Sequence, residues 1–331
     1  MKPKRETGLT AGARLIVTKD RPRNHQGGDP YRSSGHRPKG GPSPGKHWKD
    51  RPKGPRPPRG GGSFGDRREA SFVDGEDIWI WGLHAVSAAL ANDQRKIHVA
   101  LISPSVLERL GLTRETLPEG AQICEPREID IRLPPGAVHQ GVAIKASPLA
   151  SLDISDAAMT PDRPLVILDS VTDPQNVGAI FRSAAAFGLG GVVMQTRRAP
   201  SLGGALAKAA AGAVEHVSEV RAVNLARAID LLTDSGWRVI GLDASAPTRL
   251  EDAVAGEGPL AIVMGAEGEG LRPAVAKACS GLARIPMNGM MESLNVSNAA
   301  AIAFYEMARG APSRPAAAPA RSMRPAEDDE D

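Results

Sequence analysis

The sequence has few cysteines, few aromatic residues and no long hydrophobic run. Its two cysteines, Cys124 and Cys279, cannot build a disulfide framework, and neither stands in the paired Cys or His spacing of a structural zinc site. No run of about 18 apolar residues is present, so we expect no membrane-spanning helix. The first residues carry charges without the apolar core of a secretory signal. These absences predict a cytoplasmic protein without a metal site.

Glycine and proline are plentiful and concentrate at the N-terminus. Residues 1–75 hold 14 of the 36 glycines and 10 of the 28 prolines, with 18 Lys/Arg against 7 Asp/Glu. Such a segment cannot bury enough apolar surface to offset its ordering entropy, so we predict a disordered basic arm. Its charge suits either attraction to phosphate backbones or solubility, and composition leaves both open. Residues 311–331, which end in five acidic residues, are predicted as a second disordered tail.

Two folded units are predicted between these segments. Residues 76–146 mix short strands with helical patterns, which is typical of a small α/β domain, and 147–163 are predicted as a polar linker. Residues 164–310 alternate apolar strands with helices, which favours an α/β fold with a parallel sheet covered on both faces. Within 79–92 a short strand followed by a helix is expected, and further strands are expected at 97–103, 121–126, 139–146, 164–169, 192–194, 237–243, 260–265 and 283–287. A helix is expected between the strands at 97–103 and 121–126.

Neither common nucleotide-binding fingerprint is present. The 164–169 strand is followed by S-V-T-D-P-Q-N, which lacks the G-x-G-x-x-G of dinucleotide sites. The segment 40–47, GGPSPGKH, is one residue short of a P-loop and has His47 where a P-loop has Ser or Thr. One glycine cluster does follow a strand, G-A-E-G-E-G at 265–270. It could let the backbone approach a ligand closely or could form a tight turn.

Three polar clusters lie at strand ends or helix starts, at 173–184, 264–271 and 285–300. In order and spacing they resemble the three motifs of the SpoU/TrmH family of RNA ribose 2′-O-methyltransferases, within the SPOUT superfamily. The matching positions are Asn176, Gly178 and Arg182, then Gly265, Glu267, Gly268 and Gly270, and finally Ser293, Leu294, Asn295, Val296 and Ser297.

The folded unit that precedes these motifs also has family features. The segments 82–86 (GLHAV) and 139–143 (HQGVA) resemble the small RNA-binding domain of the bacterial 23S rRNA guanosine methyltransferases. The resemblance therefore covers residues 78–309. One departure is Ala210, where many members have Ser.

The resemblance implies a C-terminal domain with a deep trefoil knot that binds S-adenosylmethionine, in a homodimer. The last helix is expected to form the dimer face, with core packing as the alternative for its apolar residues Ala299, Ile302, Ala303 and Met307. Carried over residue by residue, the cofactor contacts would come from Gly265, Ile285, Met287, Ser293 and Leu294.

The implied reaction transfers a methyl group to a ribose 2′-hydroxyl. Arg182 is the expected catalytic residue, framed by Asn176, Glu267 and Asn295. A free guanidinium keeps its proton to above about pH 12, so Arg182 is better suited to stabilise the developing alkoxide or hold a phosphate than to act as a base. Asn176 could instead cap its helix.

The substrate implied by the resemblance is RNA, and the small N-terminal domain favours a guanosine of 23S rRNA. A tRNA ribose methyltransferase is the nearest alternative. A noncatalytic RNA-binding or ribosome-assembly factor with the same fold is the alternative from another class. The presence of all four polar residues, Asn176, Arg182, Glu267 and Asn295, argues against that last reading.

Overall fold

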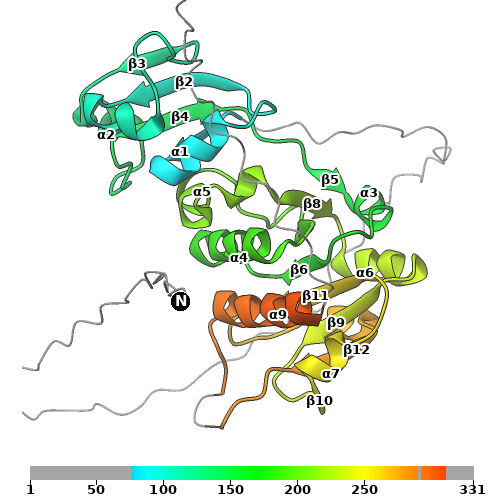
Figure 1. Ribbon diagram of the computed structural model, residues 1–331. Coiled ribbons are helices and arrows are strands. Elements are labelled where there is room, and N and C mark those ends of the chain that lie inside the picture. Colours follow the sequence, from blue (N-terminus) through cyan, green and yellow to red (C-terminus); the bar gives the residue numbers. More distant parts are fainter. Residues whose placement is uncertain (1–75, 290–291, 311–331) are drawn as a thin grey trace, which may run out of the picture. The chain divides into compact units, whose positions relative to one another are not determined.

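The computed structural model describes residues 76–289 and 292–310 (Figure 1). The predicted basic arm at 1–75 and the predicted tail at 311–331 lie outside these residues. In the described part of the chain, no helix combines the length and the apolar content needed to cross a membrane. The described strands form two separate sheets, one in the small domain and one in the C-terminal domain.

The small domain, residues 76–146, contains a four-stranded sheet in the order β1-β4-β2-β3. β4 pairs antiparallel with β1 and β2, and β2 pairs parallel with β3. Alternate strand residues point to opposite faces, so Ile80 packs with α1 while Trp81 packs with α2. The elements are β1 (Ile78–Trp81), α1 (Leu83–Leu90), β2 (Ile97–Ile102), β3 (Ala121–Ile123), α2 (Pro126–Arg132) and β4 (Val142–Ala146).

The small domain differs from the sequence prediction in its helices. The helix expected after 103 is replaced by two short 3-10 turns, Pro104–Val106 and Glu108–Leu110. Gly111, with φ 66°, ends this segment before a stable α-helix can form. The helix α2 was not predicted, although its start carries a capping-box signal: the Glu125 backbone N–H donates to the Glu128 carboxylate at 3.2 Å.

The C-terminal domain contains an eight-stranded sheet in the order β10-β12-β9-β11-β6-β7-β8-β5. Every neighbouring pair is parallel, as the alternation of strands and helices predicts. The strands are β5 (Leu152–Asp153), β6 (Leu165–Asp169), β7 (Gly191–Gln195), β8 (Ser218–Ala222), β9 (Arg238–Leu242), β10 (Thr248–Arg249), β11 (Leu260–Gly265) and β12 (Gly281–Arg284).

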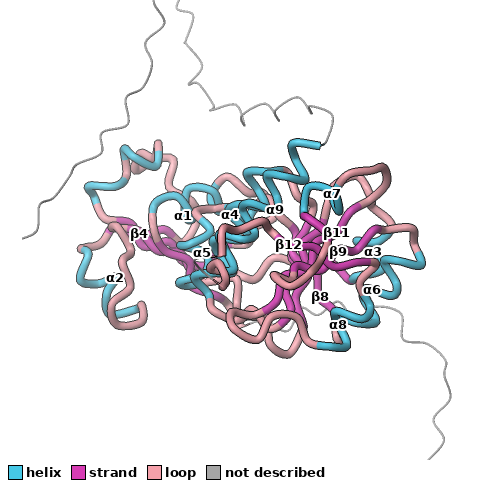
Figure 2. Tube along the Cα trace, turned by 90° about the horizontal axis from the view of Figure 1, so that it is seen from below, coloured by secondary structure: helices cyan, strands magenta, loops and turns pink. Residues whose placement is uncertain are grey.

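Helices cover both faces of this sheet, as Figure 2 shows for α4 and α9 on one side and α6 and α8 on the other. One apolar core joins the sheet to α4 and α9, and a second joins it to α3 and α6. The helices are α3 (Ile154–Ala158), α4 (Pro174–Phe187), α5 (Gly204–Ala210), α6 (Leu225–Asp234), α7 (Leu250–Val254), α8 (Pro273–Ala278) and α9 (Val296–Gly310), with a 3-10 turn η3 (Ala213–Glu215).

Three parts of the C-terminal domain differ from the sequence prediction. The segment 147–163, expected to be a linker, contains β5 and α3, and β5 pairs with β8 at the edge of the large sheet. β8 itself was not predicted, because its pattern S-E-V-R-A alternates polar and apolar residues within a domain of continuous apolar strands. The strand expected at 283–287 ends at Arg284, so Ile285 and Met287 lie in the loop that follows.

Candidate functional site

The three sequence motifs meet at one point of the C-terminal domain. The Asn295 side-chain Nδ2 donates to Glu267 Oε1 at 2.7 Å and to Asn176 Oδ1 at 3.0 Å, and Asn176 Nδ2 donates to the same Glu267 oxygen at 3.2 Å. The Val296 backbone N–H adds a fourth contact, to Glu267 Oε1 at 3.3 Å. Asn176, Glu267 and Asn295 are at least 28 positions apart in sequence, so the cluster exists only in the folded chain. Three of the four expected catalytic residues are therefore neighbours.

Helix starts hold two of these side chains in place. Asp173, not Asn176, caps α4, because its carboxylate accepts from the Asn176 backbone N–H at 3.0 Å. The Asn176 side chain is thereby left to contact Glu267. At the start of α9, Asn295 Oδ1 accepts from the Ser297 backbone N–H at 2.9 Å and from its hydroxyl at 2.6 Å. Asn295 thus uses its oxygen for the helix start and its amide nitrogen for the cluster.

Glu267 is presented by a tight glycine turn after β11. The Gly270 backbone N–H donates to the Ala266 carbonyl at 3.0 Å, and Gly268 and Gly270 have φ values of 86° and 67°. A Cβ atom on Gly265 would lie 2.2 Å from the Gly270 carbonyl carbon. The glycine cluster is therefore required by backbone packing, and the turn also lines a cavity.

An ion pair between a buried carboxylate and a partly exposed arginine anchors the end of this turn, and it was not predicted from the sequence. Asp169, the last residue of β6, is fully buried and accepts from the Arg272 backbone N–H at 2.8 Å and from its Nε at 2.6 Å. A carboxylate at the end of the apolar run 165–169 was the available signal, since buried charges need a partner. The pair joins β6 to the residue that precedes α8.

A cavity of about 440 Å³ opens beside the cluster and contains all five predicted cofactor contacts. Leu242, Met264 and Ile285 give it an apolar wall, and Gly265 to Gly270 give it exposed backbone. Asp243, Glu267, Glu269 and Glu292 also line it, whereas none of its described lining residues is Lys or Arg. An apolar pocket with negative charge suits a ligand that has a flat apolar ring and a positive centre, and S-adenosylmethionine has both.

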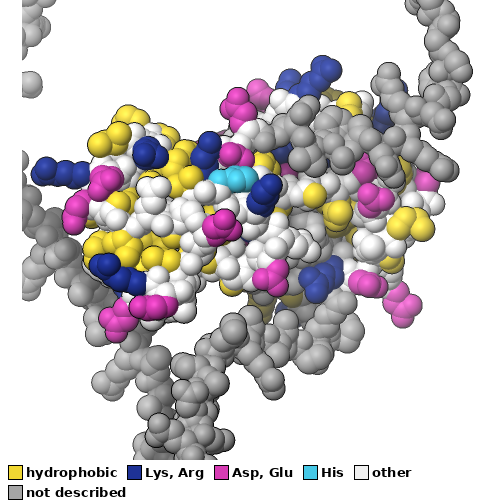
Figure 3. Space-filling model, turned by 90° about the horizontal axis from the view of Figure 1, so that it is seen from above, with side chains coloured by type: hydrophobic (Ala, Val, Ile, Leu, Met, Phe, Trp, Pro, Cys, Tyr) yellow, Lys and Arg dark blue, Asp and Glu magenta, His cyan; other side chains and the backbone are white. Residues whose placement is uncertain are grey.

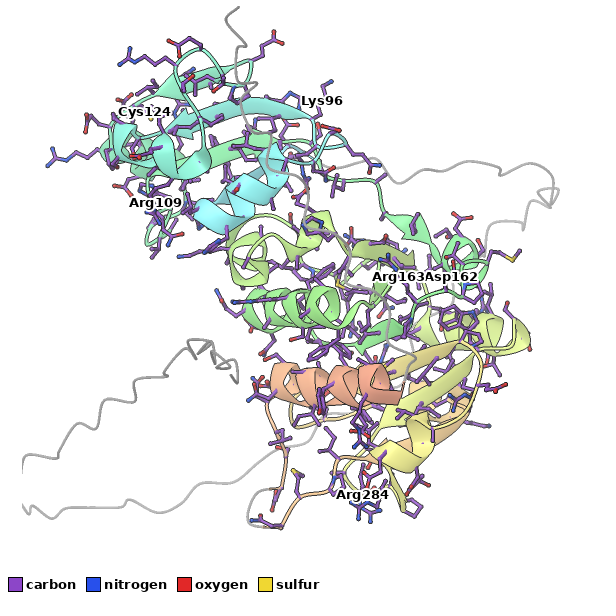
Figure 4. The ribbon with its side chains drawn as sticks, in the orientation of Figure 1. Lys96, Arg109, Cys124, Asp162, Arg163 and Arg284 are labelled. Carbon is purple, nitrogen blue, oxygen red and sulfur yellow. The ribbon has the colours of Figure 1, made fainter. Side chains whose placement is uncertain are left out.

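One of these carboxylates is held in its ionised form. Asp243 follows β9, and its Oδ1 accepts from the Ser245 hydroxyl at 2.6 Å and from the Ser245 backbone N–H at 2.7 Å. These bonds lower the pKa of Asp243. Arg284, labelled in Figure 4, ties the same loop to β12 by donating to the Ala246 carbonyl at 2.6 Å. Neither Asp243 nor Arg284 was predicted as a site residue, because the loop carries no sequence motif.

Arg182 does not join the cluster. It lies on α4 six positions after Asn176, is exposed, and makes no hydrogen bond or ion pair with the residues that the structure describes. Its helix is held against α5 through Gly178, where a Cβ would lie 2.6 Å from both the Ala209 Cβ and the Leu206 carbonyl oxygen. The motif glycine thus sets helix packing, and the guanidinium remains available to a ligand.

In the small domain, the two segments that carry the resemblance are neighbours. The Leu83 backbone N–H at the start of α1 donates to the Gln140 side-chain oxygen at 3.0 Å. The N-cap residue of α1 is Gly82, which has no side chain, so Gln140 caps the helix in its place. Gln140 has a φ of 56°, and His139 next to it contacts Asp130 at 3.1 Å. The two segments therefore define one local structure.

Two further predictions concern the last helix and metals. Ala303 and Met307 of α9 pack in the core, which leaves Ile302 and Tyr305 exposed at 42% and 56%. The apolar residues expected at the dimer face are thus partly core residues, as the alternative reading held. Among the described residues, no group of three or more His, Cys, Asp or Glu could hold a metal ion.

Charges are mixed over the folded part. Residues 76–310 hold 20 Lys/Arg and 26 Asp/Glu. Figure 3 shows basic and acidic side chains interspersed over the face it presents. The excess of positive charge in the chain therefore belongs to residues 1–75.

Comparisons with known proteins agree with this geometry. The SpoU rRNA Methylase family model matches residues 163–305, and the RNA 2′-O ribose methyltransferase substrate binding model matches 79–152. The chain is 37% identical to the 23S rRNA (guanosine-2′-O-)-methyltransferase RlmB of Photorhabdus laumondii, over 70% of this chain and 97% of that protein. It is also 37% identical to an uncharacterized tRNA/rRNA methyltransferase of Synechocystis, over 70% of this chain and 62% of that protein.

Solved structures share the fold. An AdoMet-bound rRNA methyltransferase from Sinorhizobium meliloti matches with a TM-score of 0.60 and 24% identity, over 72% of this chain and 88% of that one. The SpoU methyltransferase AviRb from Streptomyces viridochromogenes, in complex with AdoMet, matches with a TM-score of 0.58 and 21% identity, over 70% and 89%.

Proposed function

We propose that this chain, which belongs to the SpoU rRNA methylase family, transfers a methyl group from S-adenosylmethionine to the 2′-hydroxyl of a guanosine ribose in 23S rRNA. The observation that carries the proposal is the Asn176–Glu267–Asn295 cluster at the edge of the 440 Å³ cavity. All three family motifs contribute to it.

The chain's residues supply position and electrostatics. S-adenosylmethionine brings an activated methyl group, so much of the rate depends on holding the ribose hydroxyl in line with it. Glu267, fixed by Asn176, Asn295 and Val296, holds the glycine turn against the starts of α4 and α9. The exposed Arg182 guanidinium stabilises the negative charge that develops on the 2′-oxygen or holds the adjacent phosphate.

The finer parts of the proposal rest on the relatives. The match to a 23S rRNA guanosine methyltransferase over almost its whole length, and the substrate-binding model at 79–152, favour rRNA. Relatives named tRNA/rRNA methyltransferase keep tRNA as the alternative substrate. The trefoil knot, the cytoplasmic location and the homodimer are part of the same proposal, and the exposed Ile302 and Tyr305 of α9 support the last.

Transfer of labelled methyl groups tests the proposal. The full chain is incubated with labelled S-adenosylmethionine and either 23S rRNA or tRNA lacking their own modifications. We expect label in one ribose of 23S rRNA. Label confined to tRNA would contradict the proposed rRNA substrate and support the proposed reaction. Cofactor binding without transfer to either RNA would favour the noncatalytic alternative.

A further inference from the structure

A second cavity, of about 850 Å³, shares no lining residue with the cofactor cavity. Its walls come from β1 of the small domain, from the 148–151 segment and, in the C-terminal domain, from β8, the 196–203 loop and the start of α5. Pro174, two positions before Asn176 on α4, also lines it, so the cavity borders the helix that carries part of the catalytic cluster. The proposed reaction does not use it.

Part of the wall of this cavity is aromatic and apolar. Trp79 and Trp81 of β1 line it together with proline and leucine side chains. Trp81 is 7% exposed and lies against the 203–204 backbone: a Cβ on Gly204 would be 3.0 Å from its ring. Trp79 is half-buried. Aromatic faces of this kind stack on unpaired nucleobases with little regard to sequence.

The same cavity contains one buried acid–base pair. Glu219 and Arg221 lie two positions apart on β8 and form an ion pair, with side chains 8% and 21% exposed. Burial raises the pKa of the Glu219 carboxyl despite the nearby guanidinium. The ion pair joins Arg221 Nη2 to Glu219 Oε1. A buried carboxylate of this kind is stabilised by a ligand that brings further donors.

We propose that this cavity binds one unstacked guanine base of the RNA, outside the nucleotide that is methylated. Guanine offers two adjacent donors, N1–H and N2–H, to the carboxylate of Glu219, and its O6 and N7 accept from Arg221. Trp79 stacks on the base. Three carboxylates at the cavity, those of Glu76, Asp77 and Glu219, disfavour a phosphate there and leave the base as the part of a nucleotide that fits. The inference rests on the proposed RNA substrate and deepens it.

Binding of short RNAs tests the proposal without requiring activity. Fluorescence anisotropy compares two labelled single-stranded adenosine-rich RNAs, one with a single guanosine and one with inosine, which lacks the N2 amino group. We expect the full chain to bind the guanosine RNA about tenfold more tightly. The Glu219→Gln variant should bring that ratio close to one, and Trp79→Leu should weaken the binding of both RNAs. The exposed control Glu257→Gln should leave both the ratio and the affinities unchanged.

Cofactor binding, measured by calorimetry, verifies the fold of each variant, because the cofactor cavity shares no residue with this one. A wild-type ratio of one, a ratio that survives in folded Glu219→Gln, or unchanged affinities in folded Trp79→Leu would overturn the base site. The two proposals can be contradicted independently. Guanine preference without methyl transfer would contradict the proposed reaction and support the base site. Methyl transfer without guanine preference would support the reaction and contradict the base site.

Discussion

Arg95 of the small domain and Glu215 of the C-terminal domain form a buried two-point ion pair. Arg95 Nη2 donates to Glu215 Oε1 at 2.7 Å and Nε donates to Oε2 at 3.2 Å, with side chains 1% and 0% exposed. Asn92 Nδ2 adds a bond to Oε2 at 2.8 Å, and Arg95 Nη1 donates to the Ser147 carbonyl at 2.9 Å. Each of the three guanidinium nitrogens of Arg95 thus donates a hydrogen bond, and the pair attaches the small domain to η3.

Removing one partner of this pair should therefore cost more than removing both. Arg95→Ala leaves the Glu215 charge buried and unpaired, which should lower the free energy of unfolding by about 3–5 kcal/mol. The double variant Arg95→Met/Glu215→Leu should be clearly more stable than Arg95→Ala, because no buried charge remains. Urea unfolding measures all three proteins. A double variant no more stable than Arg95→Ala would contradict the cost assigned to the unpaired Glu215 charge.

Arg182→Ala should reduce kcat for methyl transfer by about 100- to 1,000-fold, the usual effect of removing one group that stabilises developing negative charge. Its affinity for S-adenosylmethionine should remain that of the wild type, since Arg182 does not line the cofactor cavity. Arg227→Ala, an exposed arginine of α6, is the matched control. Equal losses of transfer and cofactor affinity would contradict the role assigned to Arg182.

Gly265→Ala should abolish cofactor binding. The added Cβ would lie 2.2 Å from the Gly270 carbonyl carbon, so the turn that lines the cavity must move. Gly281→Ala in β12 is the control, because its Cβ would meet nothing closer than Ile240 at 3.9 Å. Calorimetric titration with S-adenosylmethionine should show normal binding for the control alone. Normal binding by Gly265→Ala would mean that the turn does not shape the site.

The Cys279 thiol should make stability depend on pH above neutrality. Burial raises its pKa to about 11, and the negative charge of Asp169 adds to the effect. An unfolded thiol loses its proton near pH 8.5, so between there and about pH 11 the folded state holds more protons. The contribution of this group is thus complete below pH 8.5 and falls as the pH rises towards 11.

Unfolding of the wild type and of Cys279→Ala at several pH values measures this contribution, because other titrating groups are common to both. The stability difference between the two proteins should move steadily against the wild type from pH 8.5 to 10.5. A difference that stays constant would place the thiol pKa at its ordinary value.

Deleting residues 1–75 should weaken RNA binding and flatten its dependence on salt. The arm carries 18 Lys/Arg against 7 Asp/Glu, whereas residues 76–310 carry more acidic than basic residues. Each lost phosphate contact lowers the slope of log affinity against log salt by about 0.7–0.9. The modified ribose should not change, because the site lies in the folded domains. A slope equal to that of the full chain would make the arm a solubilising segment.

The sequence predicted the fold class and most strands of the C-terminal domain from local patterns. The apolar runs at 165–169 and 260–265 are strands buried on both faces, and such runs need no information from distant residues. β8 and β5 were missed for the converse reason. β5 has two residues, and it is a strand because β8 pairs with it. Local propensity is a weak guide where the partner strand decides.

The candidate site divides in the same way. The sequence by itself determined which residues carry the family motifs, and the structure places Asn176, Glu267 and Asn295 in direct contact. Only the tertiary structure decided that Asp173 rather than Asn176 caps α4, that Arg182 stands apart, and that the buried Asp169 pairs with Arg272. A motif is visible in the sequence because its residue types and spacing are local. The partner of the buried Asp169 charge lies 103 positions away, so only the folded chain identifies it.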